Sequence, residues 1–415
     1  MLDHAQRDLL SAHRTGNPHD LPSRAIPSPR AHPPGPPPRR DARRMSVSSR
    51  MSRDRRPAIV VNGKFLGAEL NGVHRTAAHY TRQLTLRAAQ DAHVRLLAPK
   101  PATADPDLPD LRPEVHPGRF GSGQGWEMLT LPRLARGALL VNLCNLAPLA
   151  HRNSVVMIHD VQSVLYPEDY TFRQVQGYRL LTPLTARRAR RVLTVSAFSK
   201  ASLIDHGVGT EDTIDVVHNG TDHIISRPAD PSILARHGLD RGGYVMILGS
   251  AKSYKNLRRV FDALREPLAS GRRLVVAGGP GADAYRAKGW APPAGTLFTG
   301  FVPDSGLRAL YEGARMFLFP SLTEGFGLPP VEAMHCATPV VAARAGAMPE
   351  VCGGAAALAD PEDTAAWRRA IERLDSDPDA VRDLTERGRR RAAELSWKAA
   401  GDRLWSLIRP LLPSG

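Results

Sequence analysis

The segment from Ser321 to Glu350 reads SLTEGFGLPPVEAMHCATPVVAARAGAMPE, and it decides more about the fold than any other part of the chain. It follows a short apolar run, residues 316–319, which is typical of a buried parallel strand. Pro329 and Pro330 then favour the start of a helix, because proline has a fixed φ and lacks the N–H that a helix start leaves unpaired. The segment is therefore predicted to be a strand-to-helix turn of an α/β domain.

The loop of this turn has the features of an anion-binding site. Gly325 and Gly327 let the backbone approach a ligand without interference from Cβ atoms, and the following helix presents unpaired N–H groups to an anion. Glu324 lies in the loop and Glu332 in the first turn of the helix, so that two carboxylates flank one pocket. These features predict a site for a diphosphate. The alternative is that Glu324 is a solvated loop residue and that Glu332 only complements the helix dipole.

Outside this segment, short β-branched runs alternate with helical stretches from Pro57 onward, as in a parallel sheet of βαβ units. The first series of predicted strands covers residues 59–61, 94–98, 155–159, 192–195 and 214–217. The second series covers residues 244–248, 273–277, 296–301, 316–319 and 339–343. We expect an α/β protein with two Rossmann-like, doubly wound parallel-sheet domains facing a cleft, and ligands at the carboxyl ends of the strands.

Composition divides the chain further. We expect a Pro/Arg-rich tail (1–56), an N-terminal domain (57–225), an interdomain linker (226–243), a C-terminal domain (244–395) and a C-terminal amphipathic helix (396–415). The tail holds nine of the 36 prolines and little apolar periodicity, so it cannot bury enough surface to fold and is predicted to be disordered. Met45 and Met51 precede the first strand closely, so the tail can also be an upstream extension of the true start.

The charge of the chain excludes some partners. The net charge is +15, and residues 1–56 contribute +7 of it through 12 Arg and 5 Asp. The rest is only moderately basic and carries no recognition-helix, zinc-finger or basic-aromatic pattern, which argues against nucleic acid. Moderate basicity suits an anionic ligand and also a transient contact with an acidic lipid surface.

Cysteine spacing and hydropathy indicate a compartment. The three cysteines, Cys144, Cys336 and Cys352, are far apart and form no C-x-x-C pair, so a disulfide framework or a structural zinc site is not supported. The longest apolar stretch, residues 138–150, is shorter than the roughly 20 residues that span a bilayer. We expect a cytoplasmic protein without a membrane anchor, with peripheral contact at the inner face of the membrane as an option.

Four further residues are candidates for the functional site. His159 and Asp160 end a predicted buried strand, where an α/β sheet presents side chains to its crevice, although such a pair is often structural. Gly72 follows Asn71 between a strand and a helix, where Asn-Gly is also a common turn. Lys255 follows the first strand of the second domain and is either a ligand-binding cation or a solvated lysine.

The central segment resembles the signature of retaining GT-B glycosyltransferases of family 4, the glycosyl transferases group 1. The matching residues are Glu324-Gly325-Phe326-Gly327-Leu328-Pro329, Glu332-Ala333-Met334, Pro339-Val340-Val341 and Met348-Pro349-Glu350. Ala337 stands where this family usually has glycine. Motifs similar to those of the family extend from Val60 to Trp397.

This resemblance implies an enzyme that moves a sugar, a hexose such as mannose, from a nucleotide diphosphate sugar to a glycan or lipid-linked acceptor in surface polysaccharide biosynthesis. It implies no cofactor and no bound metal. The final helix is expected to cross back to the first domain. The glycine loop and helix start, Gly325 to Leu328 with Phe326, are expected to bind the donor diphosphate, and Glu324 and Glu332 its sugar and ribose.

The same resemblance assigns roles to the other positions. His159 and Lys255 join Glu324 as catalytic residues: His159 hydrogen-bonds the transferred sugar, and Lys255 neutralises the leaving diphosphate. Asp160 orients the imidazole, and Gly72 allows a close backbone contact with the substrate.

Two assignments to the substrate site are less direct. Ser250 stands where the family usually has an arginine of the phosphate clamp, and Lys252 or Arg258 can compensate for it. Val302 is a candidate for contact with the nucleobase. Rival interpretations are a catalytically impaired sugar-nucleotide binding protein, a GT-B epimerase or phosphorylase, and an interaction protein acting through its arginine-rich tail.

Overall fold

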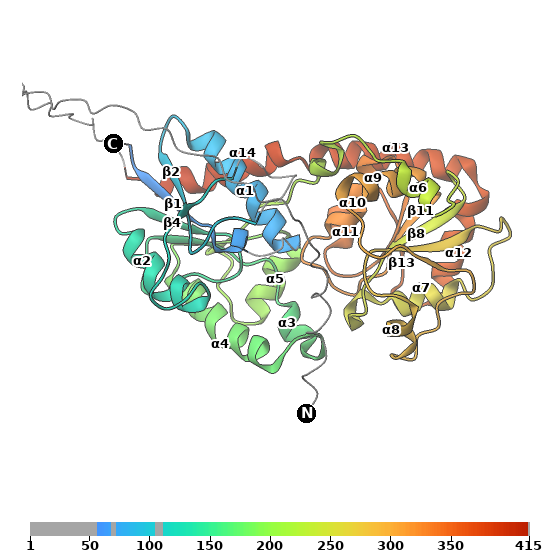
Figure 1. Ribbon diagram of the computed structural model, residues 1–415, viewed down its shortest axis with the longest axis horizontal. Helices are drawn as coiled ribbons and strands as arrows, with labels where there is room; N and C mark the ends of the chain where they lie inside the picture. Colours follow the sequence, from blue (N-terminus) through green and yellow to red (C-terminus); the bar gives the residue numbers. More distant parts are fainter. Residues whose placement is uncertain (1–55, 68–71, 104–110, 414–415) are drawn as a thin grey trace, which may run out of the picture. The chain divides into compact units, whose positions relative to one another are not determined.

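The computed structural model describes residues 56–67, 72–103 and 111–413. The prediction of a disordered tail therefore lies almost wholly outside the described residues. Within them, two parallel sheets with helices on their faces form two lobes, which we call the first lobe and the second lobe (Figure 1). This arrangement confirms the predicted fold class.

The sheet of the first lobe has seven strands in the order β3-β2-β1-β4-β5-β6-β7, all parallel. Its strands are β1 (Ala58–Asn62), β2 (His93–Ala98), β3 (Glu114–Val115), β4 (Leu139–Asn142), β5 (Ser154–Met157), β6 (Arg191–Thr194) and β7 (Ile214–Val216). The strand order reverses beside β1, which is where a doubly wound sheet forms its ligand crevice.

The sheet of the second lobe has six parallel strands in the order β10-β9-β8-β11-β12-β13. Its strands are β8 (Tyr244–Leu248), β9 (Arg273–Ala277), β10 (Leu297–Phe298), β11 (Met316–Phe319), β12 (Val340–Ala343) and β13 (Ala357–Ala359). The central strands β8 and β11 are neighbours, so the loops after them meet at one edge of the sheet.

Helices connect the strands. Those up to the start of the second sheet are η1 (Lys64–Gly67), α1 (Gly72–Ala88), the π-helical turn η2 (Trp126–Thr130), α2 (Leu131–Leu134), α3 (Gln162–Leu165), η3 (Pro167–Asp169), α4 (Phe172–Arg188), α5 (Ala197–Asp205), η4 (Asp222–Ile225) and α6 (Ser232–Arg236). Those that follow are η5 (Ser253–Lys255), α7 (Leu257–Ala263), α8 (Ala282–Arg286), α9 (Asp304–Gly313), α10 (Leu328–His335), α11 (Met348–Cys352), α12 (Thr364–Ser376), α13 (Pro378–Glu394), α14 (Trp397–Ile408) and η6 (Arg409–Leu411).

Three strands were not predicted from the sequence: β3, β4 and β13. β4 lies inside the apolar stretch 138–150, whose hydrophobicity shows no period that would separate strand from loop. β3 has two exposed residues and β13 three residues, which is too short for a recognisable pattern. The second predicted series was right in position, but β10 is shorter than the predicted 296–301.

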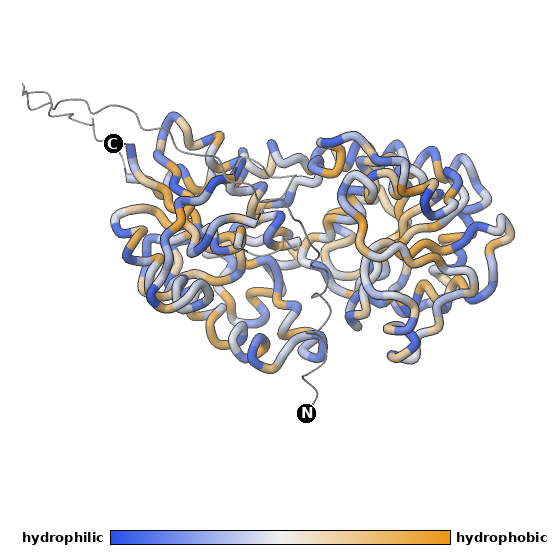
Figure 2. Tube along the Cα trace, viewed as in Figure 1, coloured by the Kyte–Doolittle hydropathy of each residue, from blue (hydrophilic) through white to orange (hydrophobic). Residues whose placement is uncertain are grey.

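The core of each lobe lies on both faces of its sheet. Along β1, Ile59 and Val61 pack on one side and Val60 on the other, and all three are buried. Figure 2 shows the hydrophobic residues concentrated along the strands inside each lobe. Near-continuous apolar strands of this kind are expected where helices cover both faces of a parallel sheet.

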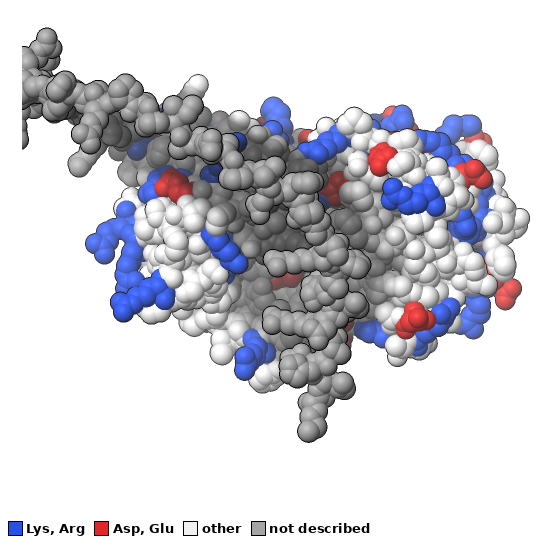
Figure 3. Space-filling view, viewed as in Figure 1, with Lys and Arg blue, Asp and Glu red and all other residues white. Residues whose placement is uncertain are grey.

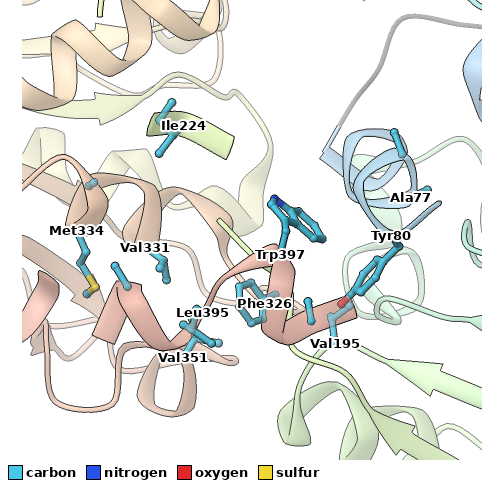
Figure 4. Close-up of a cluster of buried hydrophobic side chains, with 14 of the residues drawn as sticks. Ala77, Tyr80, Val195, Ile224, Phe326, Val331, Met334, Val351, Leu395 and Trp397 are labelled. Carbon is cyan, nitrogen blue, oxygen red and sulfur yellow. The ribbon is translucent and has the colours of Figure 1, made fainter. Parts of the chain in front are cut away.

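The last helix joins the two lobes. α14 begins after Ser396, whose side chain accepts a hydrogen bond from Ala399 N, and it packs against α1 of the first lobe. Trp397 stacks on His79 at 4.5 Å between ring centroids. It also meets Tyr80 edge-on at 5.3 Å between ring centroids (Figure 4). None of the helices in the described part of the chain has the length and apolar character needed to cross a bilayer.

Candidate active site

A cavity of about 780 Å³ is lined by both lobes at the carboxyl ends of their strands. Its volume is in the range of small-molecule sites, roughly 300–1,000 Å³. The first lobe contributes the start of α1, the loops after β4 and β5, and one side of α4; the second lobe contributes the loops after β8 and β11. Ten of the residues predicted for the site line this cavity: Gly72, His159, Asp160, Lys255, Glu324, Gly325, Phe326, Gly327, Leu328 and Glu332.

The loop between β11 and α10 needs its two glycines for different reasons. Gly327 has a φ of 81°, and a Cβ there would lie 2.2 Å from Cε of Met348. A Cβ on Gly325 would lie 2.6 Å from the carbonyl oxygen of His159 in the first lobe. Gly327 therefore makes the turn, and Gly325 allows the loop to contact the first lobe.

The prediction that Glu332 lies in the first turn of the helix is wrong. Gly327 takes the N-cap position in a left-handed conformation, so α10 begins at Leu328, one residue before the two prolines. Glu332 is consequently the fifth residue of the helix, and it is buried. The first turn of α10, all of which is described, contains no acidic side chain. The partial positive charge of the helix N-terminus at the cavity is therefore not compensated by a carboxylate of the same turn.

Glu324 and Lys255 form an ion pair across the cavity wall of the second lobe. Nζ of Lys255 donates to Oε1 of Glu324 at 2.6 Å, and the side chains are only 26% and 12% exposed. The Lys255 ammonium also lies 5.4 Å from the ring centroid of Tyr254. The pair thus places one cation and one carboxylate beside the glycine loop in the cavity.

His159 and Asp160 follow β5 and line the cavity; His159 is buried and Asp160 is partly buried. Nε2 of His159 donates to the carbonyl oxygen of Leu143 at 2.9 Å, and His159 N donates to Oδ1 of Asn145 at 2.9 Å. Burial lowers the pKa of His159 to about 4, so the imidazole is neutral at pH 7, and Nδ1 is then the acceptor nitrogen.

Asp160 has the opposite response to burial. Burial raises the pKa of Asp160 to about 6, although the hydrogen bond from Gln162 N to its Oδ1 at 3.1 Å favours the carboxylate. The nearby charge of Glu324 acts in the same direction as burial. A carboxyl group with a pKa this close to neutrality is poised to exchange its proton in the working range of pH.

Glu332 is held by a chain of hydrogen bonds that reaches α14. Nε1 of Trp397 donates to Nδ1 of His223 at 3.2 Å, and Nε2 of His223 lies 3.1 Å from Oε1 of Glu332. The hydroxyl of Tyr311 lies 3.4 Å from Oε2 of the same carboxylate. Because an indole N–H only donates, His223 accepts through Nδ1 and carries its proton on Nε2, facing Glu332.

Polar contacts between the lobes surround the glycine loop. The Oγ atoms of Ser196 and Ser199 both donate to the carbonyl oxygen of Gly325, at 2.5 and 3.1 Å. Ser196 also caps α5 by accepting a hydrogen bond from Ser199 N at 2.9 Å.

Glu350 caps the same helix from the other lobe. Its carboxylate accepts from Ala197 N at 2.9 Å, from Phe198 N at 3.1 Å and from Nε2 of His218 at 2.7 Å. Burial opposes its ionisation, but the hydrogen bonds from His218 and the two backbone groups outweigh burial and hold the pKa of Glu350 below its ordinary value. No role for Glu350 could be predicted from the sequence, because its partners are more than 130 residues away in the chain.

Ser250 and Val302 do not line the cavity. Oγ of Ser250 accepts from Lys252 N at 3.3 Å, and Val302 packs against the hydrophobic core of the second lobe. Lys252 does line the cavity, with Nζ 4.4 Å from the ring centroid of Tyr170, whereas the side chain of Arg258 is 66% exposed beside Asp262. Of the two residues that could replace the missing arginine, the structure places Lys252 at the cavity.

Other residues at the cavity had not been singled out as site residues. Tyr170, Tyr178 and Asn145 come from the first lobe, and single residues of these types carry no sequence signal. Asn219 is buried and lines the cavity, and its Oδ1 has no hydrogen-bond partner among the described residues. A buried polar atom without a partner at a cavity wall is the kind of group that a ligand satisfies. Within the same described residues, no group of three or more His, Cys, Asp or Glu side chains is arranged to hold a metal ion.

The fold and the site define a class: a glycosyltransferase with two Rossmann-like lobes, the GT-B architecture. Residues 234–391 match the family model described as glycosyl transferases group 1. O-antigen chain mannosyltransferase B of Escherichia coli is 31% identical over 268 residues, which cover 60% of this chain and 69% of that protein. The chain belongs to the glycosyl transferases group 1 family.

Two other comparisons are consistent with this assignment. O-antigen chain mannosyltransferase RfbU of Salmonella typhimurium is 26% identical over 237 residues, and the match covers 55% of this chain and 63% of that protein. The chain thus spans about two thirds of the length of these relatives. The structure of Anabaena HepE in complex with UDP and glucose has a TM-score of 0.65 at 19% identity, covering 85% of this chain and 99% of that one, and it shares the fold.

Proposed function

We propose that this chain is a retaining glycosyltransferase that transfers a hexose, with mannose as the first candidate, from a nucleotide diphosphate sugar to a glycan or lipid-linked acceptor in surface polysaccharide biosynthesis. The named activities of the Escherichia coli and Salmonella relatives support the choice of mannose and of this class of product. The observation that carries the proposal is that Lys255, Glu324 and the N-terminus of α10 meet at one cavity.

In this proposal the second lobe binds the donor. The diphosphate lies against the backbone N–H groups of Gly327 and Leu328 at the start of α10, because Pro329 and Pro330 have no N–H to offer. Lys255 faces the same place, and its charge stabilises the diphosphate as negative charge develops on the leaving group. Lys252 supplies a second cation at the cavity in place of the arginine that the family usually has.

The sugar lies between the lobes. Glu324, whose carboxylate is fixed by Lys255, accepts hydrogen bonds from sugar hydroxyls, and neutral His159 accepts one through Nδ1. Asp160 lies beside them and is the group with a pKa suited to take up the proton of an incoming hydroxyl. Attack on the face that the diphosphate leaves retains the anomeric configuration and requires no protein nucleophile.

The first lobe receives the acceptor. Gly72, where a Cβ would meet nothing within 4 Å, opens α1 towards the cavity and leaves room for an acceptor chain. Glu332 sits deeper in the second lobe and is proposed to hold the ribose. The three cysteines are unpaired in the structure, which supports the proposal that the enzyme works in a reducing cytoplasm.

The experiment measures binding and transfer separately. Isothermal titration with GDP-mannose, UDP-glucose and other nucleotide sugars identifies the donor, and transfer is then followed with oligosaccharide and lipid-linked acceptors. Lys255→Ala and Glu324→Ala should each lower transfer by about two to three orders of magnitude, the effect of losing one electrostatic contact to the transition state. Lys398→Ala, on the exposed side of α14, is the matched control and should keep wild-type activity.

The outcomes are distinguishable. Wild-type turnover in both active-site variants would reject the assigned roles. Donor binding without transfer or nucleotide release would favour the interpretation as a catalytically impaired binding protein. The loss of catalysis would then be attributed to Ser250, which stands in place of the arginine. Conversion of the donor sugar without any acceptor would favour an epimerase. An inverted product anomer, seen by NMR, would contradict the retaining mechanism.

A further inference from the structure

Helix α4 in the first lobe exposes an unusual number of large apolar side chains. Leu165 on α3, and Phe172, Leu180 and Leu184 on α4, belong to the few exposed large hydrophobic residues among those described. Phe172 is 77% exposed and Leu180 is 66% exposed. Isolated exposed leucines are common, but several on one helix indicate a surface that is covered in use.

The same helix is strongly basic. α4 contains four arginines, Arg173, Arg179, Arg187 and Arg188, and no acidic residue. All four are exposed, and none forms an ion pair with another described residue. Figure 3 shows Lys and Arg side chains spread over both lobes, with Asp and Glu among them.

The apolar and basic residues share one side of the helix. Arg173, Leu180, Leu184 and Arg187 are spaced by seven, four and three residues, which recur on one side of an α-helix. The other side of α4 is turned to the protein, and Gln174 and Tyr178 line the cavity there. α4 therefore has one side at the candidate active site and the opposite side towards solvent.

We propose that this outer side of α4 docks on an acidic lipid surface. A helix that combines exposed Leu and Phe with unpaired arginines has the composition of interfacial helices, whose apolar side chains enter the headgroup region while their cations meet anionic lipids. A protein groove would bury the apolar side chains but leave four arginines without counter-charges, and a second copy of this helix would bring like charges together. An acidic bilayer provides both environments at once.

The biological role of this lipid docking rests on the proposed function, but the docking itself does not. If the acceptor is lipid-linked, docking through α4 brings it to the helix whose inner side lines the cavity. The binding itself is tested without any acceptor. A test must also separate α4 from the arginine-rich residues 1–56, which carry a net charge of +7; the full chain is therefore used throughout, and only α4 is changed.

The experiment is co-sedimentation of the full chain with phosphatidylcholine vesicles that contain about one third phosphatidylglycerol, and with pure phosphatidylcholine vesicles. Binding should occur to the anionic vesicles and weaken with salt. Arg173→Gln/Arg187→Gln/Arg188→Gln should lower the binding constant at least tenfold, since each basic residue near such a surface changes it several-fold. Leu180→Ser should lower it several-fold.

Matched controls replace equivalent residues elsewhere. Arg382→Gln/Arg389→Gln/Arg390→Gln removes the same charge from the exposed side of α13, and Leu86→Ser removes a leucine that is 62% exposed on α1. Both should bind vesicles like the wild type.

Two outcomes would overturn the docking proposal. If the α4 variants bind as the wild type does, another segment such as the tail makes the contact. If Leu180→Ser leaves vesicle binding unchanged but converts a dimer to a monomer in sedimentation velocity, the surface is a protein interface. Donor binding by calorimetry should stay unchanged in all variants, because none replaces a cavity residue. If the wild type binds none of the nucleotide sugars, the proposed function is rejected, but the vesicle result remains valid.

Discussion

At the scale of single residues, Ala337 shows how a local deviation from the family pattern becomes visible in the structure. Its φ is 59°, in the left-handed region that L side chains rarely adopt, between α10 and β12. The resemblance to the family implied only that glycine is usual at this position. The structure supplies the physical reason, because glycine adopts this conformation without strain.

Ala337→Gly should therefore stabilise the protein. A left-handed alanine costs about 1–2 kcal/mol, and the extra freedom of glycine in the unfolded chain returns about 0.5–1 kcal/mol of this. The free energy of unfolding is expected to rise by roughly 0.5–1 kcal/mol, read from the urea midpoint at constant slope. An unchanged or lower midpoint would show that the strain is relieved elsewhere.

His159 and Asp160 should make opposite contributions to the pH dependence of stability. The folded pKa of His159 is about 4 against 6.5 for the ordinary group, so the unfolded chain binds more protons between these values and stability rises with pH. The folded pKa of Asp160 is about 6 against 3.8, so the folded chain binds more protons there and stability falls as pH rises.

Single variants should separate the two effects. Asp160→Asn removes the falling contribution, so its stability relative to wild type should increase between pH 4 and pH 7, by up to about 3 kcal/mol at 1.36 kcal/mol per pKa unit. His159→Gln should change in the opposite direction over pH 4–6.5. Urea titrations at several pH values give the differences. Parallel curves for wild type and both variants would show that neither pKa is shifted in the folded state.

At the scale of secondary-structure elements, the hydrogen bonds from Trp397 through His223 to Glu332 connect α14, η4 and α10. If Glu332 holds the ribose, His223 is a positioning residue that fixes the carboxylate without touching the donor. The same Trp397 ring stacks on His79 of α1.

His223→Ala should raise the KM for the donor roughly tenfold with little change in kcat, because a hydrogen bond to a charged group contributes about 1.5 kcal/mol. His223→Gln can still accept from Trp397 and donate to Glu332, so it should recover most of the affinity. His206→Ala, at the exposed end of α5, is the control. An unchanged KM in His223→Ala, or an equal loss in His223→Gln, would leave His223 with a packing role only.

At the scale of the whole molecule, the sequence was sufficient for the fold class, and ten of the predicted site residues lie at the cavity. Both rely on local patterns: apolar runs that alternate with helices, and a glycine-rich turn with fixed spacing. It was not sufficient for β4, whose apolar stretch has no period, or for Glu350, Asn145 and Tyr178. Those residues reach the site only because the topology brings distant loops together. A single sequence does not show which loops lie close to one another in space.

The carbonyl oxygen of Gly325 is bound by two serines of the first lobe, while Glu350 of the second lobe binds the start of the helix that carries them. The backbone that is proposed to bind the donor thus also connects the first lobe to the second lobe. Any separation of the halves that admits a substrate must break these bonds and release the glycine loop at the same moment. If the proposed donor enters by separation of the lobes, its entry and the assembly of this loop are therefore coupled.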